Sequence, residues 1–221
     1  KRDLQRESGH GAQRPAHRLG LRLGHAAQQV GDGRRRGLRP FAALERTVND
    51  WRPDAVITNL ATATAMDDYP MLEALREKVE RRIVFGFHAM ALPDEMFQHG
   101  ATHILVGDPE CGVAAAVKDA QDNLNGIWTP GKTSAPPGAV EPLDDLPFPA
   151  LDLLDLDAYH SMIMGKQRFS ILLANRGCPY PCPYCVIPFL FGRKVRTLSV
   201  PRIVAEIERD MKEFNIRSFF F

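Results

Sequence analysis

Cys178-Pro-Tyr-Pro-Cys-Pro-Tyr-Cys185 is a short run that holds three of the four cysteines in this chain of 221 residues. It follows an apolar run of strand length, Phe169-Ser-Ile-Leu-Leu-Ala174, and the breaker Asn175-Arg-Gly177. The prolines keep the run out of a helix, and the glycine permits a tight entry. Three thiolates on one loop can hold three corners of a cubic iron–sulfur cluster and leave the fourth iron without a protein ligand.

Two other uses of the cysteines fit the sequence less well. Tetrahedral structural zinc takes four ligands, usually as two separated pairs, and the remaining cysteine, Cys111, lies far upstream. A disulfide framework is typical of small, secreted, cysteine-dense chains, whereas this chain shows no signal peptide and few cysteines. The pattern therefore favours a cluster in a reducing, cytoplasmic environment.

The residues after the loop predict a helix and a second strand. Ser199 can cap a helix whose first turn holds Pro201, and Asn215 can end it. Apolar residues recur on one face of this helix, at Ile203, Ile207, Met211 and Phe214. The run Ile216-Arg-Ser-Phe-Phe-Phe221 then has the pattern of a buried strand. Residues 168–221 thus predict strand, cysteine loop, helix and strand.

This part resembles the radical S-adenosylmethionine (SAM) superfamily, whose signature is C-x3-C-x-aromatic-C after the first strand of a partial (β/α) barrel. The resemblance implies that Cys178, Cys182 and Cys185 ligate a [4Fe-4S] cluster, which cleaves SAM to a 5′-deoxyadenosyl radical. Tyr184 fills the aromatic position and would lie near the adenine of SAM. The alternative for Tyr184 is an aromatic ring packed under the loop, because aromatic side chains bury a large area whatever their role.

Residues 41–128 alternate between strand and helix patterns. Strands are expected at 54–60, 82–87 and 103–106, and helices at 71–81, 92–98 and 109–124. This order predicts an α/β fold with a Rossmann-like parallel sheet, followed in the chain by the first βαβ part of the radical SAM barrel. Ligands of such sheets bind beyond the carboxyl ends of the strands.

The same residues resemble the cobalamin-binding-like domain that precedes the barrel in a large radical SAM class. The likeness lies in Pro53-Asp-Ala-Val-Ile-Thr58, Phe85-Gly-Phe-His-Ala89 and Val106-Gly-Asp-Pro-Glu110. It implies that Thr58, Gly86, His88 and Gly107 line a cobalamin site. No D-x-H-x-x-G is present, so the resemblance implies a corrin bound without a histidine ligand to cobalt. The alternative for His88 is a strand-end histidine hydrogen-bonded to protein.

Two further segments complete the expected organisation. Residues 1–40 carry ten Lys and Arg against three Asp and Glu and offer little to bury, which fits a basic arm, a disordered extension or an out-of-frame segment. Residues 129–167 are rich in proline and acidic residues and predict a linker. The composition of the first segment, the missing initiator methionine and the end at Phe221 suggest a truncated fragment. Cys111 opens a predicted helix, where its thiol is either reactive or simply buried.

The sequence therefore predicts a radical SAM enzyme that transfers a methyl group to an unactivated centre with the help of cobalamin. A small-molecule substrate and an external electron donor such as flavodoxin or ferredoxin are expected, in the cytoplasm. An RNA methylthiotransferase-like enzyme is one alternative, although such enzymes carry three more upstream cysteines. A non-catalytic cluster-binding fragment is another. Nucleic acid is not expected, since no aromatics interleave the basic residues, and no apolar run reaches the ~18 residues that span a bilayer.

Overall fold

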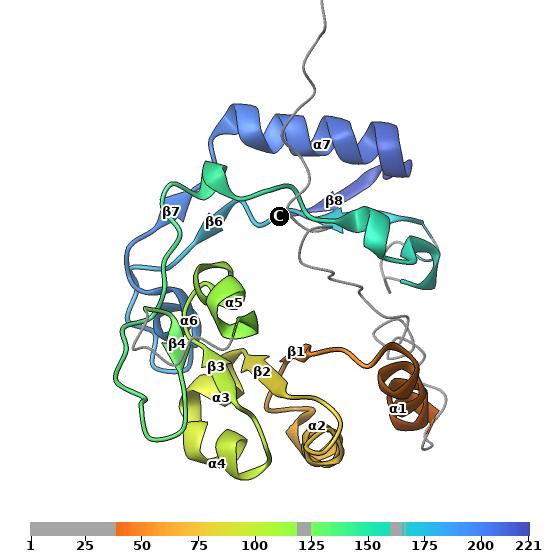
Figure 1. Cartoon of the computed structure of the whole chain (residues 1–221). Helices are drawn as coiled ribbons and strands as arrows, with labels where there is room; N and C mark the ends of the chain where they lie inside the picture. The colour runs from red at the N-terminus through yellow and green to blue at the C-terminus, as the bar shows by residue number, and fades with distance from the viewer. Residues whose placement is uncertain (1–38, 119–124, 160–164, 166) are drawn as a thin grey trace, which may run out of the picture.

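The computed structural model describes residues 39–118, 125–159, 165 and 167–221 (Figure 1). It contains a four-stranded sheet with its helices and a smaller βαβ unit (Figure 1). Nearly all of the segment 1–40 lies outside the described residues, as do 119–124 of the helix predicted at 109–124. None of the described helices combines the length and apolar character needed to cross a membrane.

The larger sheet is built from three parallel strands in chain order. They are β1 (Ala55–Asn59), β2 (Arg81–Phe85) and β3 (His103–Leu105), with Ile57 opposite Ile83 and Val84 opposite Ile104. A fourth strand, β4 (Ile127–Trp128), pairs antiparallel with β3 and was not predicted from the sequence. The expected parallel α/β sheet is therefore present, with an added antiparallel edge.

Alternate residues of these strands pack against helices on opposite faces of the sheet. Val84 and Ile104 face α2 (Ala65–Ala74), α3 (Phe87–Ala91) and α4 (Pro93–Gln98). Ile83 and Leu105 face α5 (Pro109–Val117). A helix that the sequence did not reveal, α1 (Arg39–Trp51), packs Val48 against the segment after α2. The strands thus present apolar side chains on both faces of the sheet, and helices cover both faces.

Two predicted elements in this region have wrong boundaries. The helix expected at 71–81 is α2, which begins at Ala65 and ends at Ala74, with Pro70 inside it. Asp67 and Asp68 in its first turn favour this earlier start, because carboxylates stabilise the amino end of a helix. The strand expected to reach Phe87 ends at Phe85, since Gly86 adopts a φ of +107° and the chain turns into α3.

The segment 129–159 holds no strand and no α-helix; its regular pieces are the 3₁₀ turns Leu143–Asp145, Leu151–Leu153 and Leu156–Ala158. It is nevertheless anchored to the sheet. Gly138 forms a bridge to Gly107, and the indole of Trp128 donates to the carbonyl of Ala135 over 2.8 Å. The proline-rich segment that was expected to be a linker thus lies against β3 and β4.

The smaller unit has the predicted order of elements. Strand β5 (Phe169–Ile171) pairs in parallel with β8 (Ser218–Phe220), and α7 (Val200–Phe214) connects them (Figure 1). The Ser199 hydroxyl accepts a hydrogen bond from the Arg202 amide, and Asn215 ends the helix, both as predicted. Asn215 adopts the left-handed conformation. Three elements between β5 and α7 were not predicted: β6 (Asn175–Arg176), α6 (Ile187–Phe191) and β7 (Arg196–Thr197).

The predicted apolar face of α7 is covered in part. Ile203, Ile207 and Phe214 are half-buried, whereas Met211 is 37% exposed. The most buried residues of the helix are Glu206 and Asp210, which lie on this same face, three and seven residues after Ile203. Each carboxylate has an arginine partner, Arg202 for Glu206 and Arg209 for Asp210. The apolar period correctly predicted the helix and most of its covered face, but not the two buried carboxylates on that face, whose burial the ion pairs make tolerable.

Candidate functional site: the cysteine loop and the sheet edge beside it

The cysteine run forms a loop that a two-stranded neck closes. Its ends pair as β6 and β7, with Arg176 opposite Arg196. Gly177 has a φ of +87°, and a Cβ there would lie 2.1 Å from the carbonyl oxygen of Lys194. The Cys178 amide donates to the Gly192 carbonyl over 3.1 Å. Only glycine allows this close approach, so the predicted tight entry is explained by the neck.

All three cysteine side chains in this loop are half-buried and free of disulfides. The Cys185 amide donates to the Cys182 carbonyl over 3.2 Å, so these two residues bracket a turn. Within the described part of the chain, no three Cys, His, Asp or Glu side chains converge as a metal-ligand group. The donor set nevertheless fits an iron–sulfur cluster in its chemistry, since it offers three free thiols on one loop without secondary structure of its own.

Tyr184 projects from this loop into solvent. Its side chain is 86% exposed, and that of Tyr180 is 68% exposed. The alternative in which Tyr184 packs under the loop is therefore wrong for this structure. A contact between Tyr184 and the adenine of SAM stays a prediction.

Buried ion pairs connect the neck of the loop to the end of β3. The Asp108 carboxylate is fully buried and accepts hydrogen bonds from Arg196 and from the Val140 amide, the latter over 2.8 Å. Arg176 approaches Asp108 at 3.1 Å and binds both oxygens of Glu110, at 2.9 and 2.7 Å. We call Asp108, Glu110, Arg176 and Arg196 the carboxylate–arginine hub.

The hub lowers the pKa values of its two carboxylates, Asp108 and Glu110. Burial alone would raise the pKa of Asp108, but the Arg196 and Val140 hydrogen bonds and the Arg176 charge outweigh it, and the pKa of Asp108 is lowered. The pKa of Glu110 is also lowered, because its hydrogen bonds from Arg176 outweigh burial. Both carboxylates are thus held in their charged form.

The predicted cobalamin residues all lie at or near the carboxyl edge of the sheet, and three of them are engaged by protein. A Cβ at Gly86 would lie 2.4 Å from the Asn59 amide oxygen, and one at Gly107 would lie 2.2 Å from the Gly138 carbonyl oxygen. The imidazole of His88 is hydrogen-bonded at both nitrogens. Thr58, on β1, is half-buried. A contact between these residues and a corrin stays a prediction.

His88 belongs to a buried polar chain. Its ring is joined to the Tyr69 hydroxyl over 2.6 Å and to the Thr62 hydroxyl over 3.2 Å. Burial, together with Glu95, raises the pKa of Tyr69 to about 12. The ring of His99 stacks on Tyr69 with centroids 3.9 Å apart, and its Nδ1 lies 2.7 Å from Glu73. The interpretation of His88 as a histidine satisfied within the protein accounts for its contacts.

Cys111 matches neither of its predicted roles. It is exposed, and its pKa is raised by partial burial and by the nearby carboxylates of Asp108 and Glu110. A thiol with a raised pKa is a poor nucleophile at neutral pH. The first turn of a helix would lower the pKa of this thiol, but partial burial and the two carboxylates outweigh that effect.

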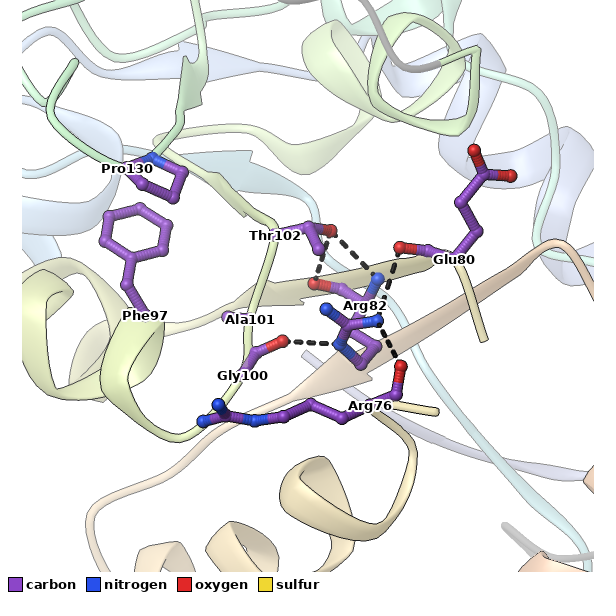
Figure 2. A pocket seen from close by; sticks show the side chains of 8 residues that line it. All are labelled: Arg76, Glu80, Arg82, Phe97, Gly100, Ala101, Thr102 and Pro130. Carbon is purple, nitrogen blue, oxygen red and sulfur yellow. Dashed lines mark hydrogen bonds between the residues drawn. The ribbon is translucent and has the colours of Figure 1, made fainter. Parts of the chain in front are cut away.

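A pocket of close to 470 Å³ lies far from these residues, where β2 begins (Figure 2). Its central side chain, Arg82, donates to the carbonyls of Gly100 and Val79 and also to those of Arg76 and Glu80. Thr102 closes the group by bonding to the backbone of Arg82 (Figure 2). Burial lowers the pKa of Arg82. Because backbone carbonyls already occupy the guanidinium, the pocket is a structural feature of the amino end of the sheet.

The sequence did not reveal the hub. Arg176 and Arg196 flank the cysteine loop, and Asp108 and Glu110 follow β3, but one sequence does not show which opposite charges meet across so many residues. The available signal was the placement of both acidic residues in a segment already singled out, Val106-Gly-Asp-Pro-Glu110, and of an arginine directly before Gly177.

No family model matches the chain. Among curated proteins it is 31% identical over 164 residues to an uncharacterized methyltransferase of Synechocystis, covering 72% of this chain and 27% of the relative. It is 26% identical over 175 residues to hopanoid C-3 methylase of Methylococcus capsulatus, covering 74% and 34%. It is 32% identical over 95 residues to cytidylyl-2-hydroxyethylphosphonate methyltransferase of Streptomyces wedmorensis, covering 40% and 18%. The chain therefore spans about a third or less of the length of these relatives.

Solved structures with a similar fold include TsrM of Kitasatospora setae, a radical SAM methyltransferase. The form with cobalamin and a [4Fe-4S] cluster bound matches at a TM-score of 0.57 with 13% identity, over 80% of this chain and 39% of TsrM. The form with tryptophan substrate and a SAM analogue matches at 0.57 with 14% identity, over 82% and 39%. The chain thus combines the α/β fold of part of a radical SAM methyltransferase with sequence similarity to proteins named as methyltransferases.

Proposed function

We propose that this chain carries the cluster-binding part of a radical SAM methyltransferase. The observation that carries the proposal is the position of the free thiols of Cys178, Cys182 and Cys185. They lie on one loop that follows the first strand of a parallel βαβ unit, β5–α7–β8. The carboxyl ends of parallel barrel strands are where active sites form. The names of the curated relatives support methyl transfer as the outcome.

In this proposal the three cysteines hold a [4Fe-4S] cluster, with one iron left for SAM. When bound, the cluster supplies the electron that cleaves the sulfonium of SAM. The protein's own part is to position the thiols, through the β6–β7 neck and the hydrogen bond from Cys178 to Gly192. Tyr184, exposed on the same loop, is available to stack on the adenine.

Cobalamin as a second cofactor is a separate part of the proposal. The cobalamin-bound form of TsrM shares the fold, and the expected Rossmann-like sheet places its carboxyl edge near the cysteine loop, where Phe87 of α3 meets Phe189 of α6 with ring centroids 5.7 Å apart. The engaged states of Gly86, His88 and Gly107 do not support direct ligation, so no step is assigned to the corrin. Uptake of hydroxocobalamin by the purified chain, measured by absorbance after gel filtration, tests this part.

We also propose that the substrate is a small molecule with an unactivated methyl-accepting centre. The names of two relatives, a hopanoid methylase and a phosphonate methyltransferase, support a small molecule. An external electron donor, such as flavodoxin or ferredoxin, and a cytoplasmic location complete the proposal.

Iron reconstitution of the purified chain under anaerobic conditions tests the central claim. The parent is expected to bind a cluster with charge-transfer absorbance, and Cys182→Ala is expected to lose most of its iron. Cys111→Ala is the matched control, because this exposed cysteine lies outside the loop and its loss leaves all three proposed ligands in place. Equal iron in the parent and in Cys182→Ala would rule out the assignment.

A second measurement separates the enzyme from a cluster-binding module without turnover. With SAM and dithionite, the reconstituted parent is expected to form 5′-deoxyadenosine, which chromatography detects. Formation of a cluster without this product favours the module. An RNA methylthiotransferase would bind a second cluster, so a stoichiometry near eight irons would favour that class, whereas about four irons support the present proposal.

A further inference from the structure

The carboxylate–arginine hub joins the two parts of the molecule at one buried point. Asp108 follows β3 on the sheet side, and Arg176 and Arg196 lie on the two strands of the neck that closes the cysteine loop. The side chains of Asp108, Arg196 and Arg176 are 0%, 4% and 11% exposed. Removing charges from water in this way is costly unless each is paired and hydrogen-bonded.

Both carboxylate oxygens and the backbone amide of Asp108 take part in this connection. One carboxylate oxygen accepts from Arg196 and from the Val140 amide, and the other lies 3.1 Å from Arg176 and 3.4 Å from Arg196. Its own amide donates to the Gly138 carbonyl over 2.9 Å. Asp108 therefore fixes the linker and the neck at the same time.

Both arginines reach the loop through more than the hub. Arg196 also donates to the carbonyls of Val140 at 2.8 Å and of Phe191 at 3.2 Å, the latter within α6. Arg176 lies two residues before Cys178, and its guanidinium lies over the ring of Phe191 in α6, 5.8 Å from the ring centroid. A shift of Asp108, which contacts both arginines, would thus move both ends of the loop that carries the cysteines, whereas a shift of Glu110 would move only the end at Arg176.

We propose that Asp108, with Glu110 as its second contact, is a positioning residue for the cysteine loop. It acts through Arg176 and Arg196 and sets where the three thiols lie relative to the carboxyl edge of the β1–β3 sheet. In this view the acidic residues after β3 serve the cluster loop and are not groups that contact a corrin. The inference rests on the proposed function only for its cluster readout, because its effect on the loop is measurable without iron.

Hydrogen–deuterium exchange of the iron-free chain is the first test. Asp108→Asn keeps the shape and removes the charge, and it should raise exchange in residues 177–195 by about tenfold or more, because both arginines lose a buried partner. Asp108→Glu should restore part of the protection. Glu141→Gln is the matched control: it removes the exposed ion pair to Lys194 on the same loop and should change exchange less than about twofold.

The second readout is spectroscopic. In the reconstituted chain, Asp108→Asn should keep its iron but change the electron paramagnetic resonance spectrum of the reduced cluster on addition of SAM, with Asp108→Glu returning toward the parent signal. A residue that only supports the fold would not alter this spectrum in chains with equal iron content.

The outcomes are distinguishable. Unchanged exchange in 177–195 for Asp108→Asn, with β1–β3 still protected, would overturn the positioning role. If Asp108→Asn also loses the protection of β1–β3, then Arg196→Gln, which lies outside that sheet, decides by the same measurement. A parent chain that binds no iron would remove the proposed cluster while leaving the exchange result to decide on the hub.

Discussion

The β1–β3 sheet and the β5–α7–β8 unit are both parallel arrangements, yet they bury different chemistry. In the sheet, aliphatic residues such as Ile83, Val84 and Ile104 are completely buried between helices. In the second unit, the buried residues of α7 are the acidic Glu206 and Asp210, and Ile171 and Leu173 on and beside β5 are more than half exposed. Apolar burial stabilises the first region, and contacts with neighbouring segments stabilise the second.

Those neighbouring contacts are largely made by arginines. Arg202 and Arg209 lie over the ring of Phe148, at 3.6 and 4.7 Å from its centroid, so the linker covers α7. Arg168 binds the Asp157 carboxylate through two hydrogen bonds of 2.6 Å. The second unit therefore depends on the rest of the chain in a way that the sheet does not.

The largest expected difference between the two regions is in the loss of unfolding free energy when an isoleucine is truncated to alanine. Ile104→Ala removes a fully buried side chain between β3 and the helices, and it should lower the free energy of unfolding by about 2–5 kcal/mol. Ile171→Ala, at a strand position that is 60% exposed, should cost less than about 0.5 kcal/mol. Urea unfolding followed by circular dichroism measures both, and equal losses would contradict the proposed difference between the regions.

Glycine substitutions in the cysteine loop should come next. Gly192→Ala carries only the strain of its positive φ, about 1–3 kcal/mol, since nothing lies within 4 Å of the added Cβ. Gly177→Ala carries similar strain and also meets the Lys194 carbonyl, which should add about 1–3 kcal/mol. Thermal unfolding of the two variants gives the comparison. A Gly177→Ala chain no less stable than Gly192→Ala would show that the neck is looser than described.

The cap of α7 gives a smaller test of the second region. Ser199→Ala removes the acceptor for the Arg202 amide and should lower the free energy of unfolding by about 1 kcal/mol. Ser199→Asn keeps a capping oxygen and should recover most of this loss. Chemical unfolding measures both variants, and identical values for Ala and Asn would mean that the cap contributes nothing.

The smallest expected effect is the contribution of the hub to the pH dependence of the free energy of unfolding. Because the pKa values of Asp108 and Glu110 are lowered in the folded chain, the stability that they contribute is complete above the ordinary carboxyl pKa of about 4 and is lost as the pH falls through the folded values. Unfolding curves between neutral pH and pH 3 should therefore fall less steeply for Asp108→Asn than for the parent. Parallel curves would contradict the assigned shifts.

The sequence predicted what depends on local pattern and missed what depends on distant partners. The strand positions, the Ser199 cap, the Asn215 terminus and the glycine at the loop entry all follow from short-range rules, and the structure contains each of them. The short strands β4, β6 and β7 have two residues each, too few to give a period.

Side-chain partners were the least predictable part of the candidate site. The apolar period of α7 identified the helix, but not that Glu206 and Asp210 on the same face are its most buried residues, with Arg202 and Arg209 as their partners. In the same way, the close approach of Asn59 to Gly86 and of Gly138 to Gly107 was not evident from the sequence. Such choices are made by tertiary packing, which one sequence does not display.

The two-stranded neck at Arg176 and Arg196 also changes the cost of altering the loop's length. Because the ends are held by β6–β7 pairing and by the hub, loop closure alone would add only about 0.6 kcal/mol for each doubling of the loop's length. The contacts inside the loop set the stronger limit: Phe189 of α6 packs on Phe87, and the Phe191 carbonyl accepts from Arg196. Changes of length that leave α6 and the entry at Gly177 in place should therefore be tolerated best in related chains.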